Sequence, residues 1–473
     1  MIFADDVYFR TRTLPILLGG GLLYFVLRIS DVPINAVALA IVLMVGLCLL
    51  KLPVAVALIA AALLGGLHAG MTLPEALTAF NDNLLAGAQV GITYVMIGAF
   101  AVALSRSGLL EWLAAVIARR IDGNTARVHR QVKWLLFGIF LVASLLSQNV
   151  VPVHIAFIPI LIPPLLGVMN TLRMDRRAVA CVLACAISVS YLLLPIGFGA
   201  IYLNDILLGN MQSNGVEATA AMAPKAMFFP VMGILAGMLF AVFVTYRQPR
   251  DYQQVVIKAA PVVQTRVIRW PQLLATLLAI AVALLCQIWF DSLLAGGLIG
   301  FVILAFAGIF CWQEQDDVFT DGVRLMAQIA VIITVASGFA GVLTATGDIE
   351  PLVRTAAQWI GDNKMLGAAI MLVVGLFITI GFGDSFASVP ILAPVYVPLA
   401  IALGFSPLAA MSLLGAAAAL GDAGSPASTI TLGATAGLNA DGQHDHIKDS
   451  VIPTFLHANL GMLLFAWLAL WWL

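Results

Sequence analysis

The feature that most constrains this chain is its succession of apolar stretches, each about as long as a bilayer is thick. A helix that crosses the hydrocarbon core needs about 20 mostly apolar residues. Of 473 residues, 62% are hydrophobic and 10% are charged, whereas a soluble domain carries about 25% charged residues. Too little polar surface remains for a soluble enzyme, a disordered chain or a secreted disulfide scaffold. The net charge of −1 also excludes a basic surface for nucleic acid. The sequence predicts an all-α polytopic membrane protein.

Two apolar regions, 133–168 and 365–404, are too long for one span, and each is interrupted by a polar tip. Each region is either two crossing helices or a re-entrant helical hairpin that enters and leaves on one side. The tips read Ser147-Gln148-Asn149-Val150-Val151-Pro152 and Gly381-Phe382-Gly383-Asp384-Ser385. The single spans are predicted at 14–29, 33–50, 53–70, 86–107, 178–203, 225–246, 272–290, 293–311, 325–345, 407–438 and 451–473.

The distribution of basic residues favours hairpins. With two hairpins, about 11 helices cross the membrane, and 19 of the 23 Lys and Arg residues fall in loops on the side of the N-terminus. Because basic loops stay in the cytoplasm, we expect a cytoplasmic (inner) membrane protein with its N-terminus inside and its C-terminus outside. The first hairpin then enters from the cytoplasm and the second from outside.

An internal repeat supports this topology. At an offset of 239, Gln89 aligns with Gln328 and Glu111 with Glu350, among seven identities in residues 88–111. Each half then has five crossings and one hairpin, so the second half is inverted, which is the pattern of secondary transporters. The predicted parts are an N-terminal segment with an extra helix (1–32), a first repeat (33–246), a cytoplasmic linker (247–271) and a second repeat (272–473).

Two spans are also predicted to break at mid-membrane. One breaks at Pro195 and Gly197, and the other near Gly421 and Pro426, because proline removes a helix hydrogen bond and glycine lets the chain unwind. Unwound segments offer carbonyl oxygens to Na⁺ and half-helix N-termini to a carboxylate.

Asp384 and Asp422 are the strongest candidates for cation coupling, because a carboxylate inside an apolar stretch must be paired, protonated or bound to a cation. Each could instead cap the N-terminus of a half-helix, and a capping carboxylate can also bind a cation. His154 is either a proton-coupling residue or a structural donor. The predicted cation-coupling residues are Asp384, Asp422, Ser388, Gly383, Gly421, Ser428 and His154. The predicted substrate-binding residues are Ser147, Gln148, Asn149, Ser188, Tyr191, Ser385, Ser425 and Thr429.

Two polar segments are assigned no role in transport. A metal site could be formed by the cluster of Asp441, His444, Asp445, His446 and Asp449, but we interpret 441–449 as a solvated linker. We likewise expect the acidic residues of 314–321 to form a solvated loop. No metal is expected beyond Na⁺ at Asp384 and Asp422, and no cofactor beyond Na⁺ or H⁺ as the coupling ion.

The interrupted halves, with Ser-Gln-Asn at one tip and Gly-Asp-Ser at the other, resemble the ion transporter superfamily. Within it, the run from Gly91 to Gly108, GITYVMIGAFAVALSRSG, resembles the NhaC-like Na⁺/H⁺ antiporter family, and in particular its YuiF-type amino-acid transporters, some of which are associated with histidine. The resemblance covers roughly 33–473. It implies that substrate and cation meet where Asp384, Asp422, Ser147 and Asn149 stand, and related architectures often form homodimers.

The leading hypothesis is therefore a Na⁺- or H⁺-coupled carrier of a small amino acid, working by alternating access. The alternative is a Na⁺/H⁺ antiporter with no organic substrate. A channel fits inverted halves less well. An intramembrane hydrolase at Gly383-Asp384-Ser385 would need a base placed by a third group, and His154 is the one buried candidate, so no enzyme activity is expected.

Overall fold

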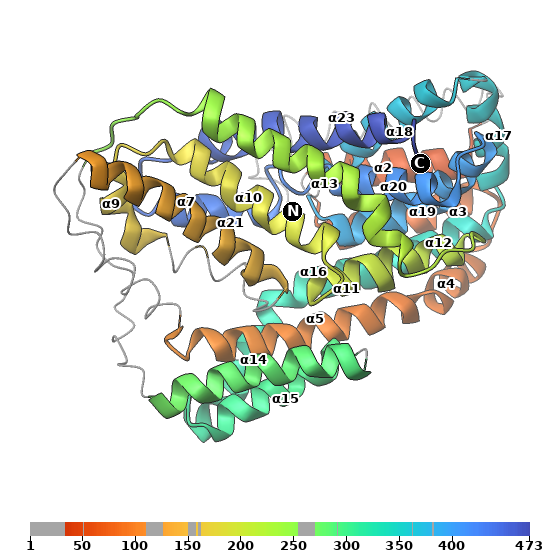
Figure 1. Cartoon of the computed structure of the whole chain (residues 1–473). Helices are drawn as coiled ribbons and strands as arrows, with labels where there is room; N and C mark the ends of the chain where they lie inside the picture. Colours follow the sequence, from red (N-terminus) through yellow and green to blue (C-terminus); the bar gives the residue numbers. More distant parts are fainter. Residues whose placement is uncertain are drawn as a thin grey trace, which may run out of the picture.

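The computed structural model describes residues 34–50, 52–109, 126–149, 158, 162–253, 270–290, 292–361, 363–380 and 383–473. These residues form helices and connecting loops, without a strand, and the long helices run roughly side by side in one bundle (Figure 1). The predicted all-helical membrane architecture is therefore confirmed. The extra helix expected at 14–29 lies outside the described residues.

Among the described residues, seven helical runs are long and apolar enough to cross a membrane. They are α5 (Leu84–Ser105), α10 (Arg176–Leu193), α13 with η4 (Met222–Thr245), α14 (Trp270–Phe290), η5 with α16 (Trp312–Ala345), α19 (Ser385–Ala402) and the run from η6 to α23 (His446–Ala469). Shorter apolar stretches are α2 (Ala36–Leu49), α3 (Val54–His68), the part Gln131–Leu146 of α7 (Ala126–Asn149), α15 (Leu293–Phe306), α18 (Lys364–Ile380), α20 (Pro407–Ala419) and α21 (Thr429–Leu438). The remaining helices are α4 (Leu73–Asp82), η2 (Pro163–Leu165), α9 (Leu166–Thr171), α11 (Phe198–Ala200), η3 (Ile201–Leu208), α12 (Gly209–Ser213) and α17 (Ile349–Ile360).

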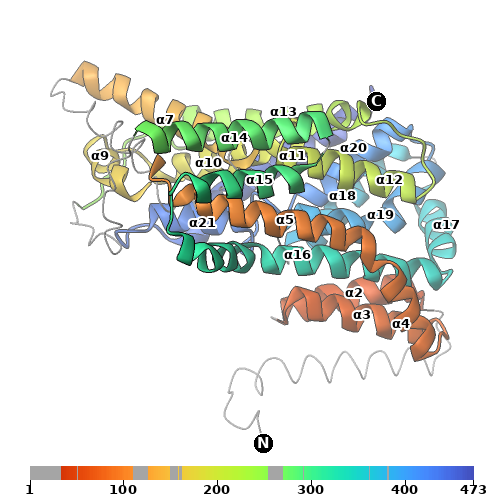
Figure 2. The same cartoon turned by 90° about the horizontal axis from the view of Figure 1, so that it is seen from below.

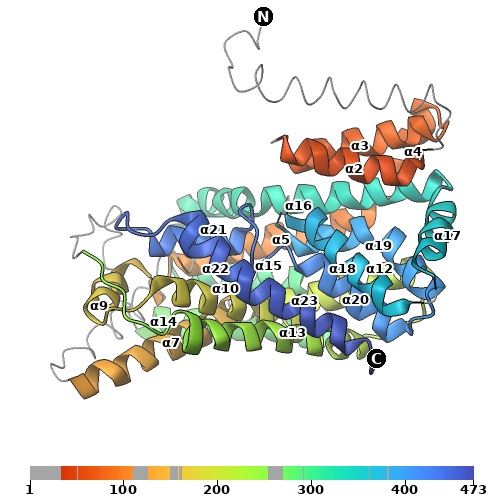
Figure 3. The same ribbon diagram turned by 90° about the horizontal axis from the view of Figure 1, so that it is seen from above.

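The bundle has two ends with different chemistry. At the linker end, where α9 lies, Arg106 pairs with Asp321 at 3.2 Å. Further ion pairs there are made by Arg173 in the loop after α9, by Arg176 and Arg177 of α10 and by Arg250 after η4. At the opposite end, which we call the α17 end, Asn35 Nδ2 donates to the Asp348 carbonyl at 2.7 Å. Figures 2 and 3 show α9 at one end, and α4 and α17 at the other.

The region predicted as the second hairpin is two helices, α18 and α19, that meet at a non-helical tip. Their outer ends both lie at the α17 end, since the Lys364 ammonium donates to the Gly404 carbonyl at 2.7 Å. In the first hairpin region α7 ends at Asn149, and 150–157 lie outside the described residues. The repeat and domain boundaries stay predictions.

Both predicted helix breaks are present. α10 ends at Leu193, and Gly197 has a φ of +59° that side chains with a Cβ rarely adopt. α20 ends at Ala419, and α21 begins only at Thr429 after an N-cap at Ser428, whose hydroxyl accepts from the Ile430 amide at 3.1 Å. The sequence therefore places both interruptions correctly, because proline and glycine act locally.

α5 and α16, which carry the aligned repeat sequences, pack against each other along their length (Figure 2). Their glycines permit this approach. A Cβ on Gly98 would lie 2.5 Å from the Gly322 carbonyl oxygen, and one on Gly322 would lie 2.3 Å from Ala99 Cα. Small residues at helix contacts are the usual packing device in membranes, where no water drives helices together.

The prediction that 441–449 is a solvated linker is wrong for the side chains of Asp441, His444 and Asp449, whereas Gly442, Asp445, Ile447 and Lys448 are exposed. His444 is 2% exposed, and the Asp441 and Arg176 side chains are 1% and 0% exposed. Arg176 Nη1 donates to Asp441 Oδ1 at 2.6 Å. The Asp441 side chain is enclosed because the guanidinium buried at the start of α10 needs a carboxylate. No group of three metal-binding side chains occurs among the described residues.

The acidic segment 314–321 is also not a loop. Its residues belong to η5 and to the first turns of α16, so this span begins well before the predicted residue 325. Asp321 and Glu314 face Arg106 at 3.2 Å and 3.7 Å. Acidic residues in a first helical turn favour helix over loop because they complement the helix dipole.

Candidate functional site

The tip between α18 and α19 interlocks with the break between α20 and α21. Gly383, with a φ of +63°, approaches Ser428 so closely that a Cβ would lie 2.6 Å from its amide nitrogen. A Cβ on Gly421 would lie 2.3 Å from the Thr379 carbonyl oxygen. The Ser425 hydroxyl donates to the Ile380 carbonyl at 2.8 Å. The two irregular segments thus provide hydrogen-bond partners for each other's polar groups inside the bundle, as burial in a membrane requires.

Asp384 caps α19. Its Oδ1 accepts a hydrogen bond from the Ala387 amide at 2.9 Å, and the Ser388 hydroxyl donates to the Asp384 carbonyl at 2.5 Å. The structural role weighed for Asp384 is therefore present. The same carboxylate also lines a cavity, so the cap leaves it open to a second role.

Asp422 is held by two neutral donors from other elements. Its Oδ2 accepts from the Tyr191 hydroxyl of α10 and from the Ser385 hydroxyl of α19 at 2.7 Å. The Tyr191 and Ser385 oxygens are themselves 2.9 Å apart. All three residues are buried, with 6% of Asp422 exposed. One carboxylate oxygen therefore joins both broken helices to the hairpin tip.

Asp384 and Asp422 line one small cavity, which we call the inner cavity. Aromatic rings wall it, with Tyr94 4.8 Å from Phe198 and 5.4 Å from Phe386 between ring centroids. Its volume is about 20 Å³, and one water needs roughly 10–15 Å³. The inner cavity therefore has room for a water or a bare cation. Its lining residues are Tyr94, Tyr191, Phe198, Ile329, Asp384, Phe386, Asp422, Thr429 and Ile430.

In the described part of the chain, no Lys, Arg or His side chain pairs with the carboxylates of the inner cavity. Among the ion pairs of the described residues, none involves Asp384 or Asp422. A carboxylate at membrane depth without a partner is costly. The two carboxyl groups can therefore share or take up protons, or bind a cation whose charge replaces the missing Lys or Arg.

The structure brings together most of the predicted second-half residues with Tyr191. Ser188 is buried in α10 but does not line the inner cavity, and its hydroxyl has no partner among the described residues. The side chains of Ser147, Gln148 and Asn149 and all of His154 lie outside the described residues.

The sequence reasoning missed the aromatic wall. Tyr94, Phe198 and Phe386 are distant in sequence and meet only in the fold. The available signal was local: Tyr94 lies in a glycine- and alanine-rich helix, and Phe386 directly follows the Gly-Asp-Ser tip.

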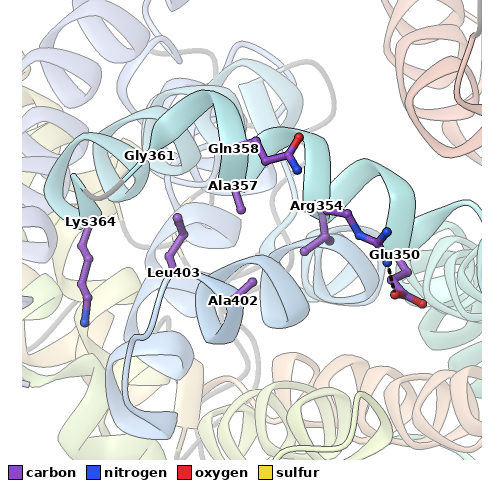
Figure 4. A pocket seen from close by; sticks show the side chains of 9 residues that line it. Glu350, Arg354, Ala357, Gln358, Gly361, Lys364, Ala402 and Leu403 are labelled. Carbon is purple, nitrogen blue, oxygen red and sulfur yellow. Dashed lines mark hydrogen bonds and ion pairs between the residues drawn. The ribbon is translucent and has the colours of Figure 1, made fainter.

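A larger hollow lies elsewhere in the described part of the chain. It is a groove of about 780 Å³ between α17 and the end of α19, at the α17 end of the bundle (Figure 4). Its charged groups are already engaged, since Arg354 pairs with Glu350 at 2.7 Å and Lys364 donates to the Gly404 carbonyl. Neither carboxylate of the inner cavity lines it, so size alone does not locate the functional site.

A membrane bundle with two broken helices, a helical hairpin tip and buried carboxylates between them defines a membrane transporter. The profile of the Na⁺/H⁺ antiporter family matches residues 184–468, and a second Na⁺-H⁺ antiporter family profile matches residues 35–121. The chain belongs to the Na⁺/H⁺ antiporter family, and the resemblance inferred from the sequence is confirmed.

Individual relatives also match most of the chain. An uncharacterized membrane protein of Vibrio parahaemolyticus is 46% identical over 437 residues, which cover 92% of this chain and 99% of that protein. One from Haemophilus influenzae is 44% identical, covering 92% and 98%. The candidate amino acid transporter YuiF of Bacillus subtilis is 44% identical, covering 92% and 99%.

Two solved structures share the fold. The Alcanivorax borkumensis YdaH transporter aligns with a TM-score of 0.58 at 19% identity, covering 91% of this chain and 97% of that one. Neisseria gonorrhoeae MtrF, described within a class of antimetabolite efflux pumps, aligns with a TM-score of 0.55 at 15% identity, covering 84% and 83%. At such identities the likeness concerns the fold alone.

Proposed function

We propose that this protein is a secondary active transporter that couples Na⁺ or H⁺ movement to transport of a small amino acid, such as histidine or another zwitterion. The observation that carries cation coupling is the pair of carboxylates at the inner cavity, held by neutral donors and caps only. The likeness to YuiF supports an amino acid as the cargo.

The geometry suits alternating access. Asp422 is bonded by α10 and by α19, two elements far apart in sequence. A cation at Asp422 screens its charge and weakens these hydrogen bonds, so occupancy of the inner cavity biases how the broken helices and the tip pack together. A ligand shifts a conformational equilibrium only through such a difference in contacts.

A second candidate is Na⁺/H⁺ antiport without an organic substrate. The volume of the inner cavity favours it, because about 20 Å³ admits a cation but not an amino acid. On the amino-acid hypothesis this conformation is closed, and the site widens when the hairpin tip moves.

Orientation and assembly belong to the same proposal. We place the linker end in the cytoplasm, because Arg106, Arg173, Arg176, Arg177 and Arg250 gather there and cytoplasmic loops retain basic residues. The C-terminus, where the Leu473 carbonyl accepts from the Ser406 hydroxyl at the α17 end, is then outside the inner membrane. An N-terminus inside stays a prediction, because it requires a crossing at 14–29, outside the described residues. We propose no cofactor other than the coupling ion, and no enzymatic step. A homodimer stays a prediction.

The test is uptake of labelled histidine by purified protein in proteoliposomes with imposed Na⁺ or H⁺ gradients and unlabelled amino acids as competitors. We expect accumulation that is lost in Asp384→Asn and in Asp422→Asn. Asp316→Asn, which neutralises an exposed acid at the start of α16, is the matched control and should transport normally. Na⁺-dependent dissipation of a pH gradient without uptake of any amino acid would instead establish the antiporter.

A further inference from the structure

A second polar cavity, which we call the outer pocket, lies behind the aromatic wall of the inner cavity. Its volume is about 100 Å³, enough for several waters at roughly 10–15 Å³ each. α5 contributes to it, as do the wide π-helical turns of η3 and the junction between α14 and α15. Its lining residues are Thr93, Ala200, Ile201, Asn204, Asp205, Gln287, Ser292, Leu293 and Leu294.

The outer pocket is lined by oxygen atoms that can coordinate a cation. The Asn204 Oδ1 is buried without a hydrogen-bond partner among the described residues. The Thr93 hydroxyl gives its proton to the Gln89 carbonyl at 3.0 Å, so its lone pairs remain available. Ser292 Oγ accepts from the Ala295 amide at 3.2 Å. Hard cations prefer carboxylate, amide and hydroxyl oxygens of this kind.

Asp205 is the one charged residue among those that line the outer pocket. Asn204 and Asp205 are consecutive residues of η3, a π-helix of eight residues. π-Helical turns are uncommon and often occur at functional sites. A single carboxylate with neutral oxygens fits a monovalent cation, and no cluster of three acidic, His or Cys ligands for a divalent ion exists among the described residues.

The two cavities are separated by a thin wall. Thr93 lines the outer pocket and its neighbour Tyr94 lines the inner cavity; likewise Ala200 lines the outer pocket and Phe198, in the same short helix α11, lines the inner one. The Tyr94 hydroxyl is buried without a partner among the described residues. An aromatic residue and one short helix thus stand between the pockets.

Gln287 ties the outer pocket to the broken helix α10. Its Oε1 accepts from the Gly197 amide at 2.6 Å, and its Nε2 donates to the Gly197 carbonyl at 3.4 Å. Gly197 directly precedes α11, which carries Phe198 of the wall. Gln287 therefore links the lining of the outer pocket to the segment that carries Phe198 of the inner cavity.

We propose that the outer pocket is a separate Na⁺ site, formed by Asp205 with Asn204, Thr93 and Ser292, at which the cation is held before it passes the Tyr94–Phe198 wall. The site itself stands on the pocket geometry. That the cation then moves from this site to Asp422 rests on the proposed function.

The test is equilibrium binding of ²²Na⁺ to the purified full chain, measured by scintillation proximity in an Asp384→Asn/Asp422→Asn background that disables the inner cavity. We expect saturable Na⁺ binding to persist there. Adding Asp205→Asn should weaken it about tenfold or more, because a charged ligand is lost, and Asn204→Ala should weaken it less. Asp316→Asn is the matched surface control.

A second measurement does not depend on the ligand residues. Leu294→Cys, in a Cys311→Ser background that removes the one exposed cysteine among the described residues, reports access to the outer pocket by its rate of maleimide labelling. Na⁺ should slow labelling relative to choline, and Asp205→Asn should abolish that protection.

The proposal is overturned if the inner-cavity variant binds no Na⁺, if Asp205→Asn leaves its affinity unchanged, or if labelling of the cysteine is insensitive to Na⁺. Failure of the proposed function looks different. In that case the wild-type protein shows neither uptake nor pH-gradient dissipation, while ²²Na⁺ binding that depends on Asp205 is retained.

Discussion

The buried ion pair between Arg176 and Asp441 offers the sharpest test of how the two halves are held together. The guanidinium of Arg176 donates to Asp441 Oδ1 at 2.6 Å, to the Leu438 carbonyl at 2.8 Å and to Asn170 Oδ1 at 2.9 Å. The Arg176 and Asp441 side chains are 0% and 1% exposed. The pair joins the start of α10 to the loop after α21 and so connects the linker ends of the two broken helices.

Removing one partner leaves the other charge enclosed without a counter-ion. A broken buried pair costs about 3–5 kcal/mol, whereas replacing both partners by apolar residues of similar volume is often neutral. We therefore expect Asp441→Leu and Arg176→Met each to lower the free energy of unfolding by about 3–5 kcal/mol. The double variant should be more stable than either single variant, so the two effects are strongly non-additive.

The assay is equilibrium unfolding in detergent micelles, followed by tryptophan fluorescence, for the wild type, both single variants and the double variant. The matched control is the Glu350–Arg354 pair on α17, where the side chains are 80% and 68% exposed. Glu350→Gln should change the unfolding free energy by less than about 1 kcal/mol. Additive losses in the Arg176/Asp441 cycle, or an Asp441 effect no larger than that of Glu350→Gln, would refute the reasoning.

Three further predictions concern a loop, a contact and the site. Burial lowers the pKa of His444 from 6.5 to about 4. As the pH falls, the unfolded chain binds the proton first, so the free energy of unfolding is full above pH 6.5 and falls by up to about 3 kcal/mol toward pH 4. His444→Gln should flatten this dependence of the free energy of unfolding on pH. Gly421→Ala should abolish uptake, since its Cβ would lie 2.3 Å from a carbonyl oxygen of α18, whereas Gly433→Ala, with 3.9 Å of space, should transport normally. Tyr191→Phe should change the apparent cation affinity by roughly 10–100-fold; Tyr202→Phe, whose hydroxyl donates to the Gly415 carbonyl at 3.1 Å, should leave it unchanged.

The elements that could be predicted are those with a local cause. The apolar spans follow from the length of hydrocarbon that a helix must cross. The break after α10 follows from Pro195 and Gly197, and the end of α20 from the glycine-rich segment around Gly421. Asp384 and Asp422 were identifiable because a charge within an apolar stretch is costly wherever the rest of the chain lies.

The errors have a common cause. The segment 441–449 looks solvated because its polarity is visible in the sequence, but its partner Arg176 is 265 residues away from Asp441. Glu314 and Asp321 are likewise far in sequence from Arg106, with which they pair. Polarity predicts that a group needs a partner, and it does not say whether that partner is water or protein.

By itself, the sequence determined that the chain is a helical membrane protein, where its helices are interrupted, and which two carboxylates lie at the interrupted segments of the second half. Only the tertiary structure decided that Tyr191 and Ser385 share one oxygen of Asp422, that aromatic rings separate an inner cavity from an outer pocket, and that a loop of the second half encloses Arg176 of the first. The physical reason is range. Hydropathy and backbone restriction act within a few residues, whereas hydrogen bonds and ion pairs between distant segments exist only after packing has excluded water.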